Sequence, residues 1–133
     1  MDEQRTISDL AREADVPIST VRYYERSGLV YPDKRTNANY RIYGDAAVER
    51  IRFIRSAQAA GFTLSDIKLL LELKDGNKAK CSEVRPLVEA RVEDVDSRIR
   101  ELQEVSRVLH SFRDICRQAD AADSCEVMEK LDP

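Results

Sequence analysis

The feature that most constrains the fold is a segment of roughly 30 residues with no glycine, and no proline after its first turn. It begins near Ser82 or Pro86 and ends near Phe112 or Cys116, which makes it longer than an ordinary globular helix. Within it, two mostly apolar rows repeat every seven residues: Val88, Val95, Leu102 and Leu109, and then Val92, Ile99 and Ser106. This two-row seam, with Arg, Glu, Asp and Gln around it, predicts a coiled coil.

One helix cannot bury such a seam alone, and the sequence offers no second long helix to cover it. We therefore expect a second copy of the chain to cover the seam, as an antiparallel or a parallel pair. Composition agrees, because 35% charged residues is too many for a thick core and 42% hydrophobic residues is too many for a disordered chain. A length of 133 residues suits one domain, or one small domain with an appendage.

The first 30 residues predict two short helices joined by a tight turn. Thr6 is the expected N-cap of the first helix, and Asp15-Val16-Pro17 breaks the chain after it. The second helix is expected from about Ser19 to Ser27, and Gly28 follows where a left-handed residue commonly ends a helix. This arrangement is typical of a helix-turn-helix.

A small hairpin is expected between Tyr31 and Tyr43. Pro32-Asp33 and Asn37-Ala38-Asn39 are turn formers, whereas residues 40–43 (YRIY) alternate and favour a strand. Next to a helix-turn-helix, such a hairpin forms a wing.

Two more helices are expected after the hairpin. Asp45 is the predicted N-cap of a helix that ends at Gly61, and residues 63–66 (TLSD) resemble a capping box that opens a helix through Leu73. After the long helix, residues 117–124 predict a small polar loop, and residues 126–131 a final helical turn.

Charge divides the chain into two unlike parts. Residues 20–60 contain eight Lys and Arg against four acids, a net of +4, whereas residues 61–133 contain 12 basic and 16 acidic residues, a net of −4. The overall charge of −3 therefore does not argue against nucleic acid, because the basic surface is N-terminal. Arg and Tyr on the second helix and on the wing can reach phosphates and base edges. The predicted DNA-binding residues are Thr20, Arg22, Tyr23, Tyr24, Arg26, Lys34, Arg35, Tyr40 and Arg41.

Tyr23 and Tyr24 cannot both serve the same surface, because adjacent residues on a helix point about 100° apart. We expect one of them to pack in the core and the other to meet DNA.

Three cysteines, Cys81, Cys116 and Cys125, cannot all pair within one chain. None forms a C-x-x-C pair, which disfavours a zinc ribbon or a thioredoxin-type site. A helix of 30 residues holds its ends roughly 45 Å apart, so Cys81 cannot meet the other two within one chain. In an antiparallel dimer, Cys81 would approach the partner's Cys116 and Cys125, and three thiolates without a neighbouring His suit a large, soft ion better than zinc.

Other classes of function find little support in the sequence. It contains no Ser/His/Asp constellation, no glycine-rich phosphate loop and no HExxH motif, so we do not expect an enzyme. His110 is the only histidine, and a surface or packing role is expected for it. No apolar run reaches the roughly 20 residues that cross a membrane, and the first residues do not resemble a signal peptide, so we expect a cytoplasmic protein.

Five stretches of the sequence carry a family resemblance: residues 18–25 (ISTVRYYE), 28–29 (GL), 40–43 (YRIY), 52–54 (RFI) and 61–67 (GFTLSDI). Together they resemble the MerR family of transcriptional regulators, and the likeness extends over essentially the whole chain. Pro17 in place of a polar N-cap and Asn39 in place of a glycine in the wing depart from the family pattern. Because Asn tolerates left-handed backbone, the wing geometry is expected to survive.

The resemblance implies a mostly α fold. A winged helix-turn-helix and the following helix pair would occupy residues 1–75, an antiparallel coiled-coil dimerisation helix residues 76–115, and a metal-binding loop with a C-terminal turn residues 116–133. It further implies a homodimer that binds a promoter operator, represses without metal, and activates RNA polymerase by distorting the DNA when metal is bound.

The cysteine spacing is similar to that of mercury-responsive members. In those, three cysteines bind Hg(II) across the dimer, here Cys81 from one chain and Cys116 and Cys125 from the other. Lead-responsive members are closely similar, so Pb(II) or Cd(II) remains an alternative. The resemblance disfavours zinc because Ile115 and Arg117 flank Cys116 and the loop has no His, and it disfavours copper and gold because those sensors have Ser in place of Cys81.

Two interpretations of other classes remain. A thiol redox sensor would use a reversible disulfide between Cys116 and Cys125, and Cys81 would then be incidental. A coiled-coil interaction protein would have no DNA role, which the +4 segment makes improbable.

Overall fold

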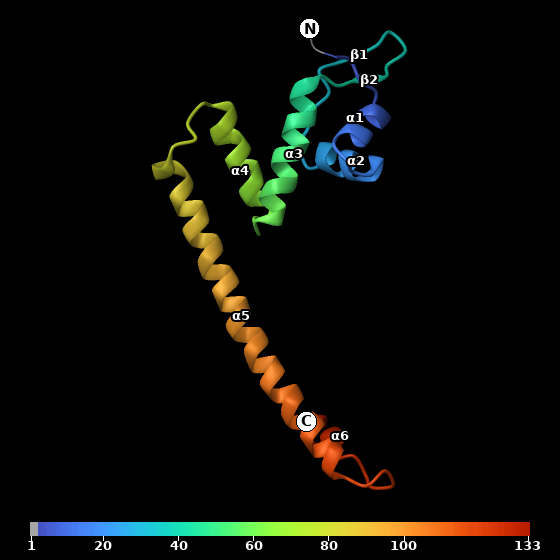
Figure 1. The fold of residues 1–133 in the computed structure, drawn as a ribbon, viewed down its shortest axis with the longest axis vertical. Coiled ribbons are helices and arrows are strands. Elements are labelled where there is room, and N and C mark those ends of the chain that lie inside the picture. The colour runs from blue at the N-terminus through green and yellow to red at the C-terminus, as the bar shows by residue number, and fades with distance from the viewer. Residues whose placement is uncertain (1–2) are drawn as a thin grey trace. The chain divides into compact units, whose positions relative to one another are not determined.

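The computed structural model describes residues 3–133, which form six helices and a two-stranded hairpin in that part of the chain (Figure 1). In chain order these are α1 (Ile7–Glu13), α2 (Ile18–Arg26), β1 (Lys34–Arg35), β2 (Arg41–Ile42), α3 (Asp45–Ala59), α4 (Leu64–Asp75), α5 (Cys81–Gln118) and α6 (Glu126–Leu131). The expected fold class is confirmed: an N-terminal helix-turn-helix with a wing, followed by a long helix. The chain divides within α5 into two compact units, one ending at Leu87 and the other spanning Val88–Pro133.

All of the buried hydrophobic side chains found among residues 3–133 lie in the first unit. The largest fully buried ones are Leu10, Val21, Leu29, Val30, Tyr43, Ile51, Ile54, Ile67 and Leu71. They come from α1 to α4 and from the segments that join these helices, so one core holds the helix-turn-helix, the wing and the following helix pair together. Burying one such aliphatic side chain contributes about 1.5–3 kcal/mol.

Two capping boxes start α1 and α4. The Thr63 hydroxyl accepts from the Asp66 N–H at 3.2 Å and the Asp66 carboxylate accepts from the Thr63 N–H at 3.0 Å, as the sequence predicts. Thr6 and Asp9 form the same pair of bonds at 3.2 Å each, which confirms Thr6 as the N-cap. The Thr6 N–H bond lowers the pKa of Asp9, because it stabilises the carboxylate.

The prediction that Asp45 caps α3 is wrong by one residue. Gly44 is the N-cap, and Asp45 is the first residue of the helix. Its carboxylate instead lies 2.7 Å from the guanidinium of Arg5, a buried side chain that also pairs with Glu13 at 2.6 Å. These partners, Asp45 above all, raise the pKa of Arg5, so the N-terminal segment is held to the start of α3 by a fixed cation.

Among the described residues with left-handed backbone, two lie at turns that the sequence predicts. Gly28 follows α2 with φ of +76°, as predicted from its place after the helix. Asn39 lies in the wing with φ of +67°, the left-handed conformation that Asn tolerates and that the sequence predicts for this position. The wing therefore keeps its hairpin, in which Lys34 pairs with Ile42 and Arg35 with Arg41 in antiparallel register.

The long helix α5 has 38 residues and extends beyond the predicted segment at both ends. Cys81 is its first residue and Cys116 lies within its last turn, so these two cysteines belong to the helix rather than flanking it. Pro86 is accommodated near the start, and Glu83 in the first turn favours helix initiation because it faces the positive end of the helix dipole. The polar loop shortens accordingly to residues 119–125, and α6 follows where it was expected.

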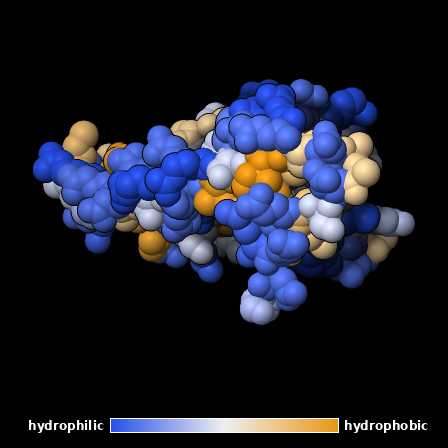
Figure 2. Space-filling view, turned by 90° about the horizontal axis from the view of Figure 1, so that it is seen from below, coloured by the Kyte–Doolittle hydropathy of each residue, from blue (hydrophilic) through white to orange (hydrophobic). Residues whose placement is uncertain are grey.

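Neither α5 nor α6, both fully within the described residues, contains a buried side chain. On the face drawn in Figure 2, hydrophilic side chains predominate, and hydrophobic ones are uncovered at several places among them. Of the helices among residues 3–133, none combines the length and apolar character that a membrane crossing requires.

Candidate nucleic-acid interface and cysteine sites

The predicted DNA-binding residues fall on α2 and the wing, and most are on the surface. Arg22, Tyr23 and Arg26 are exposed on α2, where Thr20 is half-buried. On the hairpin, the exposed residues are Lys34, Arg35, Tyr40 and Arg41. The helix and the hairpin thus present one group of cations from two elements that the core fixes in place.

Tyr24 is the exception, and its assignment to DNA is corrected. Only 2% of Tyr24 is exposed, and its hydroxyl donates to the Gln58 side chain at 2.8 Å. It lies three residues after the buried Val21, on the face of α2 that packs against the core. Burial raises the pKa of Tyr24, and the exposed neighbour Tyr23, at 46%, is the tyrosine available to a ligand.

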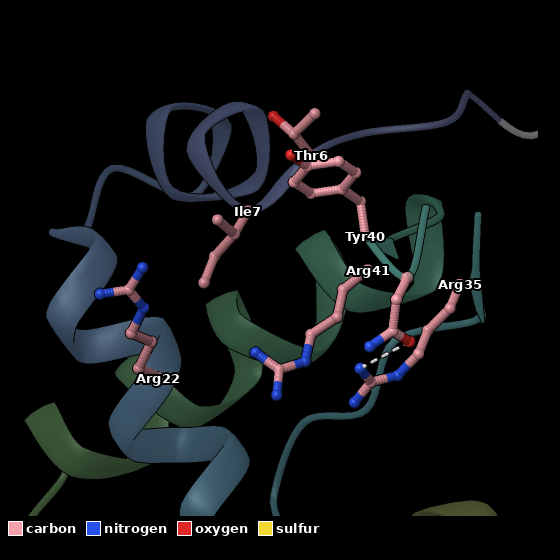
Figure 3. A pocket seen from close by; sticks show the side chains of 7 residues that line it. Thr6, Ile7, Arg22, Arg35, Tyr40 and Arg41 are labelled. Carbon is pink, nitrogen blue, oxygen red and sulfur yellow. Dashed lines mark hydrogen bonds between the residues drawn. The ribbon is translucent and has the colours of Figure 1, made fainter. Parts of the chain in front are cut away.

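An open cavity of about 370 Å³ lies where α2, the wing and the start of α1 meet (Figure 3). Arg22 reaches it from α2, and Arg35 and Arg41 reach it from the wing. The guanidinium of Arg35 donates to the Asn39 side chain at 3.2 Å, the bond drawn dashed in Figure 3. Three guanidinium groups around one opening suit phosphate oxygens, which arginine binds through several N–H groups at once.

A second groove, of about 350 Å³, shares two of these arginines and adds an acid. It is lined by Arg22, Glu25, Arg26 and Arg41. One Glu25 oxygen lies 3.4 Å from Nε of Arg41, and the other accepts a hydrogen bond from the Tyr43 hydroxyl. Burial, and then this bond to a carboxylate, raise the pKa of Tyr43.

Glu25 and Tyr43 are site residues that were not predicted from the sequence, although both lie in the motifs that carry the family resemblance. One signal was available for Tyr43, because alternate residues of a strand share a face and Tyr43 is two positions from Arg41. No local signal pairs Tyr43 or Arg41 with Glu25, because Glu25 lies on another element, 18 residues before Tyr43.

The three cysteines are free and exposed. Cys81 begins α5, Cys116 lies in the last turn of that helix, and Cys125 is the N-cap of α6. No three His, Cys, Asp or Glu side chains gather into a potential metal site in the part of the chain that the structure describes. A continuous helix rises 1.5 Å per residue, so the 35 steps from Cys81 to Cys116 amount to roughly 52 Å.

The seam of α5 is exposed along its length in the single chain. Exposure ranges from 40% for Val88 and Val95 to 67% for Leu102. His110 lies on the same helix, where it is exposed and Nδ1 is 2.7 Å from the Ser106 carbonyl oxygen, a surface role as predicted.

Comparison with known proteins gives two family matches. The family described as "MerR HTH family regulatory protein" matches residues 5–74, and the one described as "MerR, DNA binding" matches residues 48–112. The first match contains the helix-turn-helix and the wing, and the second contains most of α5.

Individual relatives resemble the chain over nearly its full length. The mercuric resistance operon regulatory protein of Bacillus cereus is 34% identical over 125 residues, which cover 94% of this chain and 95% of the relative. The HTH-type transcriptional regulator ZntR of Escherichia coli (strain K12) is also 34% identical, over 95% of this chain and 91% of the relative.

A solved structure, the transcription regulator PbrR691 from Ralstonia metallidurans CH34 in complex with lead(II), resembles the chain with a TM-score of 0.83. The two are 35% identical, over 96% of this chain and 98% of the other. Fold, motifs and relatives agree: the chain belongs to the MerR family of helix-turn-helix regulatory proteins.

Proposed function

We propose that this protein is a metal-responsive transcriptional regulator that binds a promoter operator as a homodimer. Without metal it represses, and on binding Hg(II) through Cys81, Cys116 and Cys125 it distorts the DNA and activates transcription. One observation carries the proposal: all three thiols are free and exposed, and no metal-ligand group forms within the described part of one chain. A site that uses all three thiols therefore needs two chains.

The exposed seam of α5 supports the dimer. Leu102 and Leu109 are 67% and 59% exposed in the single chain, and pairing with a second α5 would bury both. In an antiparallel pair, Cys81 at the start of one helix lies beside the end of the other, where the partner's Cys116 and the partner's Cys125 are found. Each dimer would then contain two sites of three thiolates.

The chemistry of the thiols favours Hg(II) as the ion. Thiolate is a soft ligand that selects thiophilic ions, and three thiolates leave the four-coordinate preference of zinc unmet. The relatives do not select among ions by themselves, because one is a mercuric resistance regulator and another was solved with lead(II). Pb(II) and Cd(II) are therefore alternative outcomes of the test below.

DNA binding in this proposal rests on the cations of α2 and the wing. Arg22, Arg35 and Arg41 would contact phosphates around the shared cavity, and Tyr23, Arg26, Lys34 and Tyr40 would add contacts on either side. The ion acts on transcription only through its different affinity for two conformations, since equal affinity shifts no equilibrium. Bending and untwisting of the operator then make the promoter accessible to RNA polymerase.

The ion assignment is tested by titrating reduced, purified protein with HgCl₂, Pb(II), Cd(II) and Zn(II) and recording thiolate charge-transfer absorption. We expect one Hg(II) per chain, bound in preference to the other ions. Cys81→Ser, Cys116→Ser and Cys125→Ser should each abolish metal-induced transcription and leave operator binding intact. Ser82→Ala and Ser124→Ala, which change neighbouring side chains, are the matched controls and should respond as wild type does.

The same variants distinguish the three-thiolate metal site from a thiol redox sensor. Cys116 and Cys125 both lie in the second unit and are both exposed, which is what a reversible disulfide between them would need. In that case Cys81→Ser would keep its response, and an oxidant without metal would induce transcription. A Cys81→Ser protein that responds to Hg(II) as wild type does would therefore refute the three-thiolate site.

A further inference from the structure

We propose that Glu25 is a positioning residue for DNA binding, which holds Arg41 of the wing at a fixed place relative to α2. The inference rests on the DNA-binding part of the proposed function and is independent of the ion. It starts from a carboxylate in an unexpected place, since Glu25 lines the groove that Arg22, Arg26 and Arg41 also line.

Each oxygen of Glu25 has a different partner, and the two partners come from the same part of the chain. One oxygen accepts from the Tyr43 hydroxyl, and the other lies 3.4 Å from Nε of Arg41. Glu25 itself lies on α2, in the helix-turn-helix. The carboxylate therefore joins α2 to β2 through Arg41 and to the residue that follows β2 through Tyr43.

Tyr43 makes this connection rigid. It is fully buried, and its backbone N–H and C=O both pair with the backbone of Arg5 at 2.9 Å. The side chain of Glu25 is only 13% exposed, so its position follows that of Tyr43. The core thus fixes Glu25, and Glu25 in turn restrains a side chain on the surface.

Arg41 keeps the capacity to bind DNA while it is held. Its ion pair with Glu25 uses Nε, and its side chain is 43% exposed. Figure 3 places its guanidinium in the space between α2 and the wing, and Arg22 lines the same opening from α2. An arginine restrained before DNA arrives loses less rotamer freedom on binding, which strengthens the contact without adding a new one.

A net-charge effect and a positioning effect of Glu25 predict opposite changes in DNA affinity when the acid is removed. Removing an acid from a basic surface should tighten binding to a polyanion if only net charge matters. If Glu25 positions Arg41, removing it should weaken binding. The sign of the change is therefore diagnostic.

The test uses metal-free, reduced protein and the DNA duplex that wild type recovers from a random-sequence library. Binding is followed by fluorescence anisotropy as a function of salt. We expect Glu25→Ala to weaken binding about tenfold and to lower the salt slope by about 0.9, as Arg41→Ala does by losing one phosphate contact. In an Arg41→Ala background the added Glu25→Ala change should alter binding less than about twofold, because the positioned group is already gone.

Two further variants and a thermal unfolding scan keep a folding defect apart from a positioning defect. Glu25→Gln retains an acceptor for Tyr43 but not the charge that holds Arg41, so it should fold normally and still lower the salt slope. Glu72→Ala removes an exposed acid on α4 and should bind as wild type does.

Tighter binding by Glu25→Ala, or equal loss in the wild-type and Arg41→Ala backgrounds, would overturn the positioning role. A wild-type protein that recovers no duplex would overturn this role and the proposed function together, whereas DNA binding without a metal response would affect only the latter.

Discussion

Tyr23 and Tyr24 are neighbours on α2, yet 46% of Tyr23 is exposed and only 2% of Tyr24. The difference follows from the helix repeat, which turns adjacent side chains about 100° apart. Because Val21 and Tyr24 are both buried on one face, the other face presents Arg22, Tyr23 and Arg26 to a ligand. At this scale the same residue type serves the fold at one position and the surface at the next.

The two tyrosines should therefore respond differently to substitution. Tyr24→Ala leaves a cavity in the core and should lower the free energy of unfolding by about 3–5 kcal/mol, the usual range for a buried aromatic. Tyr23→Ala should change it by less than about 0.5 kcal/mol and weaken binding to the recovered duplex. Urea unfolding and anisotropy measure the two effects, and a Tyr23→Ala protein that unfolds as easily as Tyr24→Ala would contradict the assignment.

Tyr43 gives the first unit a sensitivity to alkaline pH. Burial and the bond to Glu25 raise its pKa above the ordinary value of about 10, so the folded protein favours the neutral phenol. A raised folded-state pKa contributes stability that is fully present below about pH 10 and is lost as pH rises above it. Chemical unfolding between pH 8 and 11 should show this loss, and Tyr43→Phe should flatten it. An equal alkaline loss in the phenylalanine variant would assign the effect to other groups.

At the scale of elements, what the sequence could predict was local. Helix starts at Thr6 and Thr63, the left-handed Gly28, the hairpin and the heptad seam are each written in residues a few positions apart, and the structure contains all of them. The bounds of α5 were less predictable, because Cys and Ser neither favour nor forbid a helix strongly. Proline is common in the first turn of a helix, so Pro86 suggested a later start, whereas α5 begins at Cys81 and contains Pro86. The pairing of Glu25 with Arg41 and Tyr43 joins separate elements, so no spacing rule pointed to it.

The capping box of α4 should have a measurable effect on stability. Thr63→Ala removes the acceptor for the Asp66 N–H and should cost about 1 kcal/mol of unfolding free energy, the typical loss for an N-cap. Ser65→Ala, two residues further into the same helix, is the control and should change stability by less than about 0.5 kcal/mol. Equal losses in the two variants would mean that the box does not set the start of the helix.

At the scale of the whole molecule, the two units differ in what holds them together. The first has a core of side chains from four helices, whereas the second, Val88–Pro133, contains no buried residue. A helix as long as α5 with an exposed apolar seam is stable only if another surface covers that seam. The proposed three-thiolate site therefore requires the dimer to form.

Leu102→Glu should therefore weaken self-association by about 100-fold or more, since burying one leucine contributes about 1.5–3 kcal/mol and the dimer contains two copies. Ser97→Glu places the same charge on the opposite side of α5, at a position outside the seam, and should leave the dimer intact. Sedimentation equilibrium of the metal-free protein measures both. A Leu102→Glu protein that stays dimeric would show that the seam is not the interface.

The central claim, that each ion is held by two chains, is tested most directly by mixing chains with different defects. Cys81→Ser and Cys116→Ser homodimers should each lack a complete three-thiolate site. In the heterodimer, one site combines Cys81 of the second chain with Cys116 and Cys125 of the first, so it is complete. The other site lacks both Cys81 and Cys116 and keeps only Cys125. We expect the purified heterodimer to bind one Hg(II) with the absorption of the wild-type site. A heterodimer that binds no more Hg(II) in this form than its parent homodimers would contradict it.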